Sequence, residues 1–260
     1  MLPVNAVTNV KIVLAYDGTE YLGWQKTKIG PSIEEELQKA LETILQHPIT
    51  LQAASRTDKG VHARAQVINF FTPCPIEKLQ FQLNSLLPKS IRIFNVQKAP
   101  NDFHPTLDVL DKTYIYQIST GPFQMPQERL YAWHVRRPLN FELMQAGATL
   151  LGGTHDFAGF TNQKPSEIYT NTIRTIKSIK ITKSEQKVKI SITGKSFLYK
   201  MVRNIVGTIS YIGCQKLPLS VILDVLNSKD RSTGGITAPA HGLTLFNINY
   251  KRTLCQRQIF

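Results

Sequence analysis

Two kinds of hydrophobic spacing alternate along the first hundred residues of the chain. The run from Val10 to Tyr16 is rich in β-branched and apolar residues, which predicts a strand, and the turn pair Asp17-Gly18 ends it. Ser32 and Glu35 then form a capping-box pattern, which marks the start of a helix. The apolar residues of this helix recur on one face and are Ile33, Leu37, Leu41 and Ile44.

The rest of this region continues the same alternation. The further elements expected are an extended segment at 49–53, a strand at 65–71, a helix at 76–87 and a strand at 91–98. A polar loop at 54–60 separates the extended segment from the strand that follows it. The order is β-α-β-loop-β-α-β, which is the ferredoxin-like arrangement.

Residues 105–250 predict a second mixed unit. Lys112 to Thr120 alternate as in a strand, and Asn140 is placed to cap a helix that runs to Leu151. The further elements expected are a hairpin at 172–182 and 188–193, helices at 197–212 and 218–226, and a last strand at 243–250. We therefore expect an α+β protein with two ferredoxin-like (RRM-like) halves, whose largely antiparallel sheets meet at a central cleft. The expected domains are residues 1–104, which carry the polar loop, and residues 105–250, followed by a short tail at 251–260.

The balance of charge indicates a class of partner. The chain carries 31 Lys and Arg against 18 Asp and Glu, which gives a net charge of +13. Basic side chains that neutralise phosphates release condensed counterions, so this excess favours a nucleic acid as the partner. The alternative is a basic surface that serves solubility alone. Because 42% of the residues are hydrophobic and 19% are charged, the composition excludes a disordered chain.

The cysteines and the apolar runs bear on the compartment. Cys74, Cys214 and Cys255 are odd in number, far apart and never in a C-x-x-C pair, which argues against a disulfide framework and against a zinc site. The segment Met1–Asn5 lacks the charged and apolar regions of a signal peptide. No apolar run approaches the roughly 20 residues that span a bilayer. We expect a cytoplasmic protein that contacts no membrane.

Basic residues are concentrated in one stretch of the second half. From residue 170 to residue 203 a single acid, Glu185, stands among nine basic residues, which are Arg174, Lys177, Lys180, Lys183, Lys187, Lys189, Lys195, Lys200 and Arg203. Lys187 and Lys189 share one face of the expected strand. An edge strand protected by lysines is a sufficient explanation for the hairpin tip. It is a weaker explanation for Lys195, Lys200 and Arg203, which lie beside an apolar helix.

The polar loop is the most concentrated group of ionisable residues between two apolar strands. Arg56, Asp58 and Lys59 lie in this loop and His62 follows it, so that four such residues fall within seven positions. One interpretation is a plain exposed turn, since Asp-Lys-Gly is good turn chemistry. The other is a reactive site, because a guanidinium that pairs with Asp58 keeps this carboxylate ionised at neutral pH, ready to act as a nucleophile or a base.

The loop also carries a resemblance to a known family. Residues 56–63, Arg-Thr-Asp-Lys-Gly-Val-His-Ala, resemble the G-R-T-D-A-G-V-H-A signature of the TruA family of tRNA pseudouridine synthases. Six further segments resemble motifs of the family in the same order, and these are Tyr16–Gln25, Asn84–Pro88, Asp102–His104, Lys112–Tyr116, Phe197–Gly207 and Ala238–Leu243. The resemblance extends over roughly residues 10–250, and seven segments in the right order make it specific.

The resemblance implies a role for each matching residue. Asp58 corresponds to the aspartate that attacks or deprotonates the target nucleoside, and Tyr114 to the tyrosine that stacks on the base and removes its C5 proton. Arg203 corresponds to the arginine that pairs with the aspartate, and Arg56 to the arginine that helps to extract the uridine. The implied enzyme is an isomerase that needs no cofactor and no metal. Its implied substrate is uridine at positions 38 to 40 in the anticodon stem–loop of tRNA, and the implied assembly is a homodimer.

The candidate site residues are thus of two kinds. Asp58, Tyr114 and Arg203 are the expected catalytic residues. The expected RNA-binding residues are Arg56, Lys59, His62, Lys195 and Lys200. His62 and His104 have no metal-ligand spacing between them, which favours a structural or RNA-contacting role for each.

Three departures from the family pattern leave alternatives open. Ser55 stands in place of a glycine, Lys59 in place of a small residue, and Pro105-Thr106 where the family continues with alanine and arginine. The missing arginine raises the alternative of a pseudouridine synthase with a different tRNA or RNA target. Two further alternatives are a non-catalytic RNA-binding module and a metal-dependent nuclease. The nuclease would use Asp58 with Asp17 and Asp108.

Overall fold

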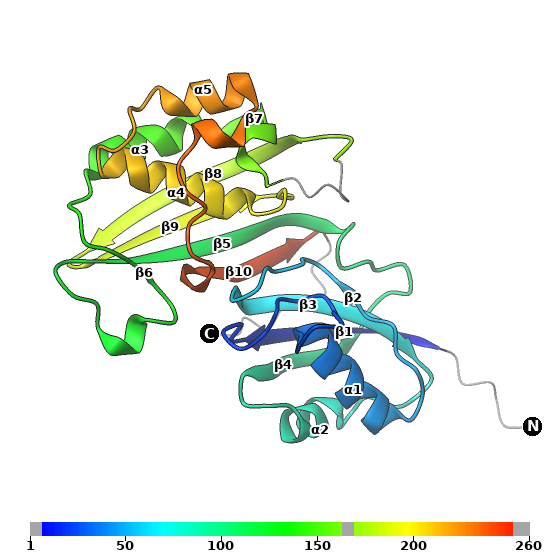
Figure 1. The fold of residues 1–260 in the computed structure, drawn as a ribbon. Coiled ribbons are helices and arrows are strands. Elements are labelled where there is room, and N and C mark those ends of the chain that lie inside the picture. The colour runs from blue at the N-terminus through cyan, green and yellow to red at the C-terminus, as the bar shows by residue number, and fades with distance from the viewer. Residues whose placement is uncertain (1–6, 163–168, 252–260) are drawn as a thin grey trace, which may run out of the picture. The chain divides into compact units, whose positions relative to one another are not determined.

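The computed structural model describes residues 7–162 and 169–251, which fall into two compact units (Figure 1). The first unit comprises residues 1–110 with 245–260, and the second comprises residues 111–244. The N-terminal segment in which no signal peptide is expected, Cys255 and residues 252–260 of the expected tail lie outside the described residues. The mixture of helices and strands in both units confirms the α+β class.

The first unit has the strand order of a ferredoxin-like fold. Its elements are β1 (Thr8–Tyr16), α1 (Ile33–Leu45), β2 (Gln52–Ala53), β3 (His62–Thr72), α2 (Leu79–Leu86) and β4 (Ile91–Lys98). The sheet order is β4-β1-β3, and the short β2 pairs with β3, with every neighbouring pair antiparallel. The last strand, β10 (Leu243–Tyr250), lies nearly all within this unit and adjoins β3.

Local sequence explains how α1 closes over this sheet. The Ser32 hydroxyl accepts a hydrogen bond from the Glu35 amide at 3.3 Å, which confirms the expected cap. Residues of the apolar helix face and of alternate positions on β1 are fully buried, and they are Ile33, Leu37, Leu41, Val10, Ile12 and Leu14. Burial of each such side chain stabilises the fold by about 1.5–3 kcal/mol. Figure 1 shows α1 and α2 together on one face of the sheet.

The described residues of the second unit also form a mixed fold, with two strands, a helix, three strands and two helices in chain order. It contains β5 (Val109–Thr120, all but its first two residues), β6 (Trp133–Val135), α3 (Phe141–Leu150), β7 (Gly153–Asp156), β8 (Ile173–Ser184), β9 (Lys187–Gly194), α4 (Met201–Gly213) and α5 (Val221–Ser228). The antiparallel sheet has the order β5-β9-β8-β7, and β6 pairs with β5 in parallel. Four short 3-10 turns, at 126–128, 158–160, 231–233 and 240–242, complete the described part of this unit.

The two faces of this second sheet differ in character. In the register of β5 with β9, Tyr114 lies opposite Ile192 and Tyr116 opposite Ile190, and all four are buried. Helices α3, α4 and α5 gather on one side of these strands (Figure 1). The opposite face of β5 contains the buried Ile115, but further along the strand it is polar, with Gln117 opposite the exposed Lys189. One face therefore belongs to the core, and the other is an open polar face.

Several elements differ from their expected bounds by a few residues, and two of these differences have a tertiary cause. The helix expected at 197–212 begins only at Met201, because Lys200 adopts a left-handed backbone with φ of +58° and breaks the helical pattern before it. The extended segment expected at 49–53 forms a ladder only at Gln52–Ala53, where it reaches β3. The short strands β6 and β7 were not expected from the sequence.

Candidate active site

The polar loop between β2 and β3 follows a path set by backbone contacts with residues 17–24. The Trp24 amide donates to the Thr57 carbonyl at 3.0 Å, and the Val61 amide donates to the Asp58 carbonyl at 3.1 Å. The second bond closes a turn that includes Asp58. The loop that carries the expected catalytic carboxylate is therefore fixed by its main chain.

Two glycines of the opening motif allow this close approach. A Cβ at Gly18 would lie 2.1 Å from the Val61 carbonyl oxygen, and a Cβ at Gly23 would lie 2.6 Å from the Thr57 carbonyl oxygen. Gly23 also has φ of +106°, a conformation that side chains disfavour. The glycines in this motif thus serve the loop that contains Asp58, more than 30 residues away in the sequence.

Side chains beneath the loop reinforce the backbone contacts. The Tyr16 hydroxyl and the Thr57 hydroxyl share a buried hydrogen bond of 2.7 Å. Nδ1 of His62 accepts from the Gly18 amide at 3.1 Å and lies 3.1 Å from Oδ1 of Asp17. His62 is only 5% exposed. Of the two roles expected for it, this burial favours the structural role, and contact of His62 with RNA stays a prediction.

The exposed side of the loop carries its charges. Arg56 and Lys59 are exposed and Asp58 is half-buried, whereas Thr57 between them is buried. A carboxylate is thus presented to solvent with a guanidinium and an ammonium on its sequence neighbours. The basic side chains of the loop favour an anionic ligand.

The departures from the family pattern fit this loop without distortion. The exposed Lys59 side chain points away from the packed side of the loop. The Ser55 carbonyl accepts from Nε2 of the buried Gln66 at 2.6 Å. The Thr106 hydroxyl, where the family has an arginine, donates to the Ala53 carbonyl at 2.8 Å, immediately before the loop. Thr106 therefore supports the loop from the segment that follows β4.

In the second unit, Tyr114 is held by an aromatic neighbour. Its ring is 7% exposed and meets the ring of Phe197 edge-on, with centroids 5.4 Å apart and an interplanar angle of 89°. Such pairs contribute about 0.5–1.5 kcal/mol beyond the area that they bury. Phe197 is the first residue of one of the matching motifs, and no role for it was predicted from the sequence. The structure shows that it orients the tyrosine.

Arg203 is oriented by the segment that precedes β10. Its Nε donates to the Ala238 carbonyl at 2.8 Å, and the Ala238 amide donates to the Arg203 carbonyl at 3.1 Å. The Tyr116 hydroxyl donates to the next carbonyl, that of Pro239, at 2.8 Å. Burial raises the pKa of Tyr116 far above its ordinary value, and the charge of Arg203 lowers it in part, which places this guanidinium near the core face of β5.

A buried hydrogen-bond network supports the same segment. Asn204 is fully buried, and its Nδ2 donates to the Phe160 carbonyl at 2.7 Å and to Oδ1 of Asn162 at 2.8 Å. Its Oδ1 accepts from the Thr237 hydroxyl at 2.7 Å and from Nη2 of Arg231 at 3.1 Å. Asn204 thus joins α4 to the residues immediately before Ala238.

Gly207 allows α4 and this segment to pack together. A Cβ at Gly207 would lie 1.7 Å from the Ile236 carbonyl oxygen. A side chain at this position is incompatible with the observed backbone. The matching motif at 197–207 therefore contains a residue that holds Tyr114, the guanidinium itself, a hub of hydrogen bonds and a contact glycine.

Lys112 is a further candidate functional residue, and it was not predicted as a site residue from the sequence. It is 7% exposed and lies two positions before Tyr114, on the same face of β5. Desolvation lowers the pKa of Lys112 to about 8, so the side chain is still mostly protonated at pH 7. Its place as the lysine of the K-x-Y-x-Y motif is the sequence signal that could have identified Lys112.

The two lysines beside α4 occupy different settings. Lys195 is exposed just after β9. Lys200 is half-buried at the start of α4, and its Nζ lies 4.9 Å from the centroid of the Tyr199 ring. Their contact with RNA stays a prediction, as does that of Arg56 and Lys59.

The described residues contain no group of three or more His, Cys, Asp or Glu side chains that could hold a metal ion. Asp17, Asp58 and Asp108 accordingly do not form the cluster that the nuclease alternative needs. Nor does any helix in the described ranges have the length and hydrophobicity to cross a membrane.

Comparison with known proteins gives a consistent result. A family model described as tRNA pseudouridine synthase matches residues 12–108 and 148–251. A protein of Protochlamydia amoebophila named tRNA pseudouridine synthase A 2 is 49% identical over 249 residues, which cover 94% of this chain and 95% of that protein. A tRNA pseudouridine synthase A of Thermoanaerobacter sp. is 46% identical over a match that covers 93% of this chain and 99% of that protein. A tRNA pseudouridine synthase A of Chlamydia felis is 39% identical over a match that covers 94% of this chain and 92% of that protein.

Proposed function

Since this chain belongs to the tRNA pseudouridine synthase family, we propose that it isomerises uridine to pseudouridine in tRNA, with Asp58 as the catalytic carboxylate. The observation that carries the assignment of Asp58 is its place in a loop that the main chain of residues 17–24 holds from one side. The other side presents Asp58 between two basic side chains.

The reaction balances without an external reactant. The bond from C1′ of the ribose to N1 of uracil breaks, the base turns, and a bond from C1′ to C5 forms. The proton at C5 leaves, and N1 gains a proton. Asp58 either attacks the nucleoside or removes a proton from it, so that the base detaches while it stays in the site.

Tyr114 holds the detached base in this proposal. A planar ring stacks on uracil in either of the orientations that the base must adopt, because stacking needs no fixed pattern of hydrogen bonds. The edge-on contact with Phe197 sets the plane in which Tyr114 presents its ring. Tyr114 then acts as a base through its phenolate oxygen, which receives the C5 proton and becomes the neutral phenol.

Arg203 is the expected partner of the Asp58 carboxylate. Its bond to the Ala238 carbonyl fixes the Nε end of the guanidinium. Pairing with a fixed guanidinium keeps a carboxylate ionised and aimed, which suits a nucleophile or base at neutral pH. Arg56 has a different role: its exposed guanidinium assists the extrusion of the target uridine, which costs a few kcal/mol of unstacking.

We further propose that the target uridines are at positions 38 to 40 of the anticodon stem–loop, and that the working form is a homodimer. A tRNA is longer than a chain of 260 residues can readily grip, and this supports a dimer. Pseudouridine mapping in tRNA after gene deletion tests the positions. A monomeric mass at working concentration with full activity would exclude the homodimer.

The reaction is tested by tritium release from tRNA that carries 5-tritiated uridine. Formation of the bond at C5 expels this tritium to water. We expect release by the wild type and none by Asp58→Asn, with tRNA binding retained. No release from any tRNA by a folded protein that binds RNA would refute the proposed activity and favour the non-catalytic RNA-binding module.

A different RNA target is the second candidate. The observation in its favour is Thr106, whose hydroxyl is bound to the Ala53 carbonyl and which cannot supply the charge of the family's arginine. The same tritium assay with separate tRNA and ribosomal RNA substrates distinguishes the two candidates.

A further inference from the structure

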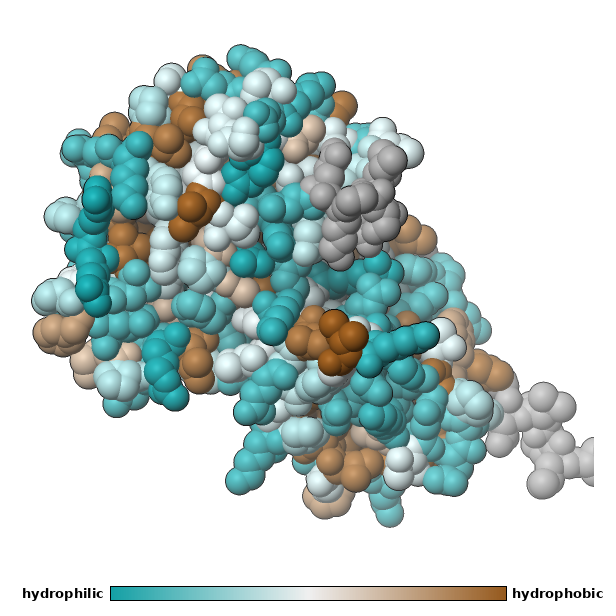
Figure 2. All heavy atoms as spheres, viewed as in Figure 1, coloured by the Kyte–Doolittle hydropathy of each residue, from teal (hydrophilic) through white to brown (hydrophobic). Residues whose placement is uncertain are grey.

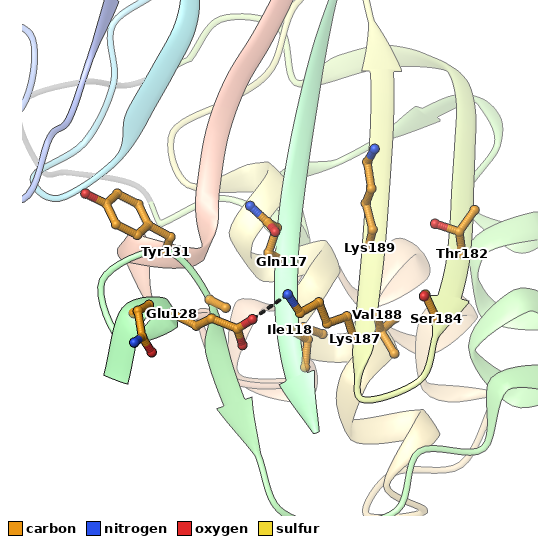
Figure 3. Close-up of a pocket in the computed structure, with 11 residues that line it drawn as sticks. Gln117, Ile118, Glu128, Tyr131, Thr182, Ser184, Lys187, Val188 and Lys189 are labelled. Carbon is orange, nitrogen blue, oxygen red and sulfur yellow. Dashed lines mark ion pairs between the residues drawn. The ribbon is translucent and has the colours of Figure 1, made fainter. Parts of the chain in front are cut away.

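The open polar face of the second unit contains a pocket that the proposed reaction does not use. The pocket has a volume of about 330 Å³ and lies where β5, β8 and β9 meet the segment before β6 (Figure 3). Its strand residues include Gln117, Thr182, Ser184, Lys187 and Lys189. Tyr114 is an odd number of positions from Gln117 and faces the opposite side of β5.

The two lysines of the pocket share one face by register. Lys189 pairs with Gln117 on β5 and with Thr182 on β8, and Lys187 pairs with Ser184. Two residues apart on a strand, their backbones are roughly 7 Å apart. Both ammonium groups can therefore approach one phosphodiester or two successive ones, with hydroxyls of Thr182 and Ser184 beside them as donors.

Glu128 supplies the one carboxylate of the pocket. It forms an ion pair with Lys187 at 2.5 Å, drawn as a dashed line in Figure 3, and the Lys187 side chain is 66% exposed. The hydrogen bond that Lys187 donates to the Glu128 carboxylate raises the pKa of Lys187, so this ammonium is charged across the neutral range. Exposed pairs of this kind contribute little to stability, so a phosphate can replace the carboxylate at small cost.

An aromatic ring completes the wall of the pocket. Tyr131 lines it, and this residue is 42% exposed. Exposed aromatic rings beside basic groups are the usual means by which proteins hold unpaired nucleotides, because a base stacks on the ring while its phosphate meets the cation. Hydrophilic residues cover much of the face of the molecule that Figure 2 shows.

We propose that this pocket is a second RNA-contact site, which takes a phosphodiester and the adjacent base of the tRNA at a point other than the target uridine. Lys187 and Lys189 bind the phosphate, and Tyr131 receives the base. The proposal rests on the proposed function, since it requires an RNA substrate. It gives a role to the lysines that the hairpin carries on its open face.

The lysines are tested by a matched pair of substitutions on the same hairpin. Lys189→Gln removes a charge from the pocket, and Lys183→Gln removes a charge from an exposed residue of β8 whose register with Val188 directs it to the other face. Equilibrium binding of tRNA is measured against salt concentration, together with KM and kcat for tritium release. Loss of one phosphate contact lowers the slope of log K against log salt by roughly 0.9.

We expect this slope change, a several-fold rise in the dissociation constant and in KM, and an unchanged kcat for Lys189→Gln. We expect no slope change for Lys183→Gln. Equal effects of the two substitutions, or no effect of either, would overturn the proposal and leave a solvated strand protected by lysines.

Glu128→Gln provides a test in the opposite direction. It removes the carboxylate that competes with a phosphate for Lys187, and the amide keeps the size of the side chain. We expect tRNA to bind several-fold more tightly, whereas an ion pair with a purely structural role predicts unchanged or weaker binding, which would contradict the proposal. Tyr131→Ala is expected to weaken tRNA binding roughly five-fold or more.

The outcomes separate this proposal from the proposed function. A wild type that releases no tritium from tRNA refutes the isomerase activity. A wild type that turns over normally, with Lys189→Gln and Lys183→Gln indistinguishable, refutes only the second contact site. Circular dichroism and Tm values of each variant, equal to those of the wild type, show that a loss of binding does not come from unfolding.

Discussion

A methyl group at position 207 is expected to disturb the arginine four residues before it. In Gly207→Ala the new Cβ would lie 1.7 Å from the Ile236 carbonyl oxygen, whereas real contacts of this type do not fall below 3.0 Å. The gap of 1.7 Å must open to at least 3.0 Å, which moves α4 or the neighbouring segment by about 1.3 Å. The obstacle is a backbone atom, so no side-chain rotation relieves it.

The displacement breaks the bonds that orient Arg203. Both the 2.8 Å bond from its Nε and the 3.1 Å backbone bond join it to Ala238, two residues after Ile236. Their loss costs about 3 kcal/mol, of which the charged bond accounts for about 1.5–3 kcal/mol. Alanine in place of glycine returns about 1 kcal/mol through helix propensity. The net effect is a destabilisation of about 2 kcal/mol, or a Tm lower by about 5 °C.

The effect on catalysis follows from the charged bond. If Arg203 holds the reacting carboxylate, loss of about 1.5–3 kcal/mol of its orientation lowers kcat roughly 10- to 100-fold. Tritium release under saturating tRNA measures kcat, and a melting curve measures Tm. KM is expected to change little, since neither Gly207 nor Ile236 is a proposed RNA contact.

Gly147→Ala in α3 is the matched control. Its Cβ would meet only the ends of flexible side chains, the nearest being Cδ1 of Ile222 at 3.1 Å. We expect wild-type kcat for this control and a stability within about 0.5 kcal/mol of the wild type. A Gly207→Ala enzyme with the kcat and Tm of the wild type would refute the argument that this contact positions Arg203.

Three further substitutions test other contacts. Phe197→Leu removes the edge-on partner of Tyr114, so kcat should fall by about three- to ten-fold while Tm stays nearly unchanged. Phe197→Tyr keeps an aromatic ring and should restore kcat. Equal kcat values for the Phe197→Leu variant and the wild type would contradict an orienting role for Phe197. Lys112 has a folded pKa of about 8 against 10.5 when unfolded, so the unfolded chain binds more protons between these values and stability rises with pH across that window. Lys112→Met should remove this rise and stabilise the protein by about 3 kcal/mol at pH 7, and a pH series of denaturant melts that shows the same slope for both proteins would exclude it. Thr106→Val removes the bond to the Ala53 carbonyl and should cost about 1 kcal/mol of stability, measured by denaturant unfolding, with Thr106→Ser as the control that keeps the hydroxyl.

Local signals in the sequence predicted the parts of the fold that depend on neighbouring residues. The caps Ser32 and Asn140 both accept the expected amide bonds, and the strand at 91–98 has the expected bounds. The start of α4 was wrong, because Phe197 continues the apolar pattern of the helix but packs against Tyr114 instead. Only the tertiary structure distinguishes these two uses of one apolar side chain.

The candidate site likewise has a part that could be predicted from the sequence and a part that could not. The charges around Asp58 are adjacent in sequence and were visible as a cluster. The support of Arg203 was not visible, because Asn204 gathers partners from Phe160 to Thr237 and no short pattern joins them. The open face that carries Lys189 required strand register, which fixes the side of each residue only once β5, β8 and β9 are paired.

The backbone contacts of the Asp58 loop have a consequence for how this enzyme can diverge. Gly18 and Gly23 touch the carbonyls of Val61 and Thr57, atoms that every residue type possesses. Exposed positions of the loop can therefore mutate without moving the carboxylate, so natural selection can alter which RNA is recognised while the chemistry is inherited unchanged. Lys59 occupies one of these exposed positions.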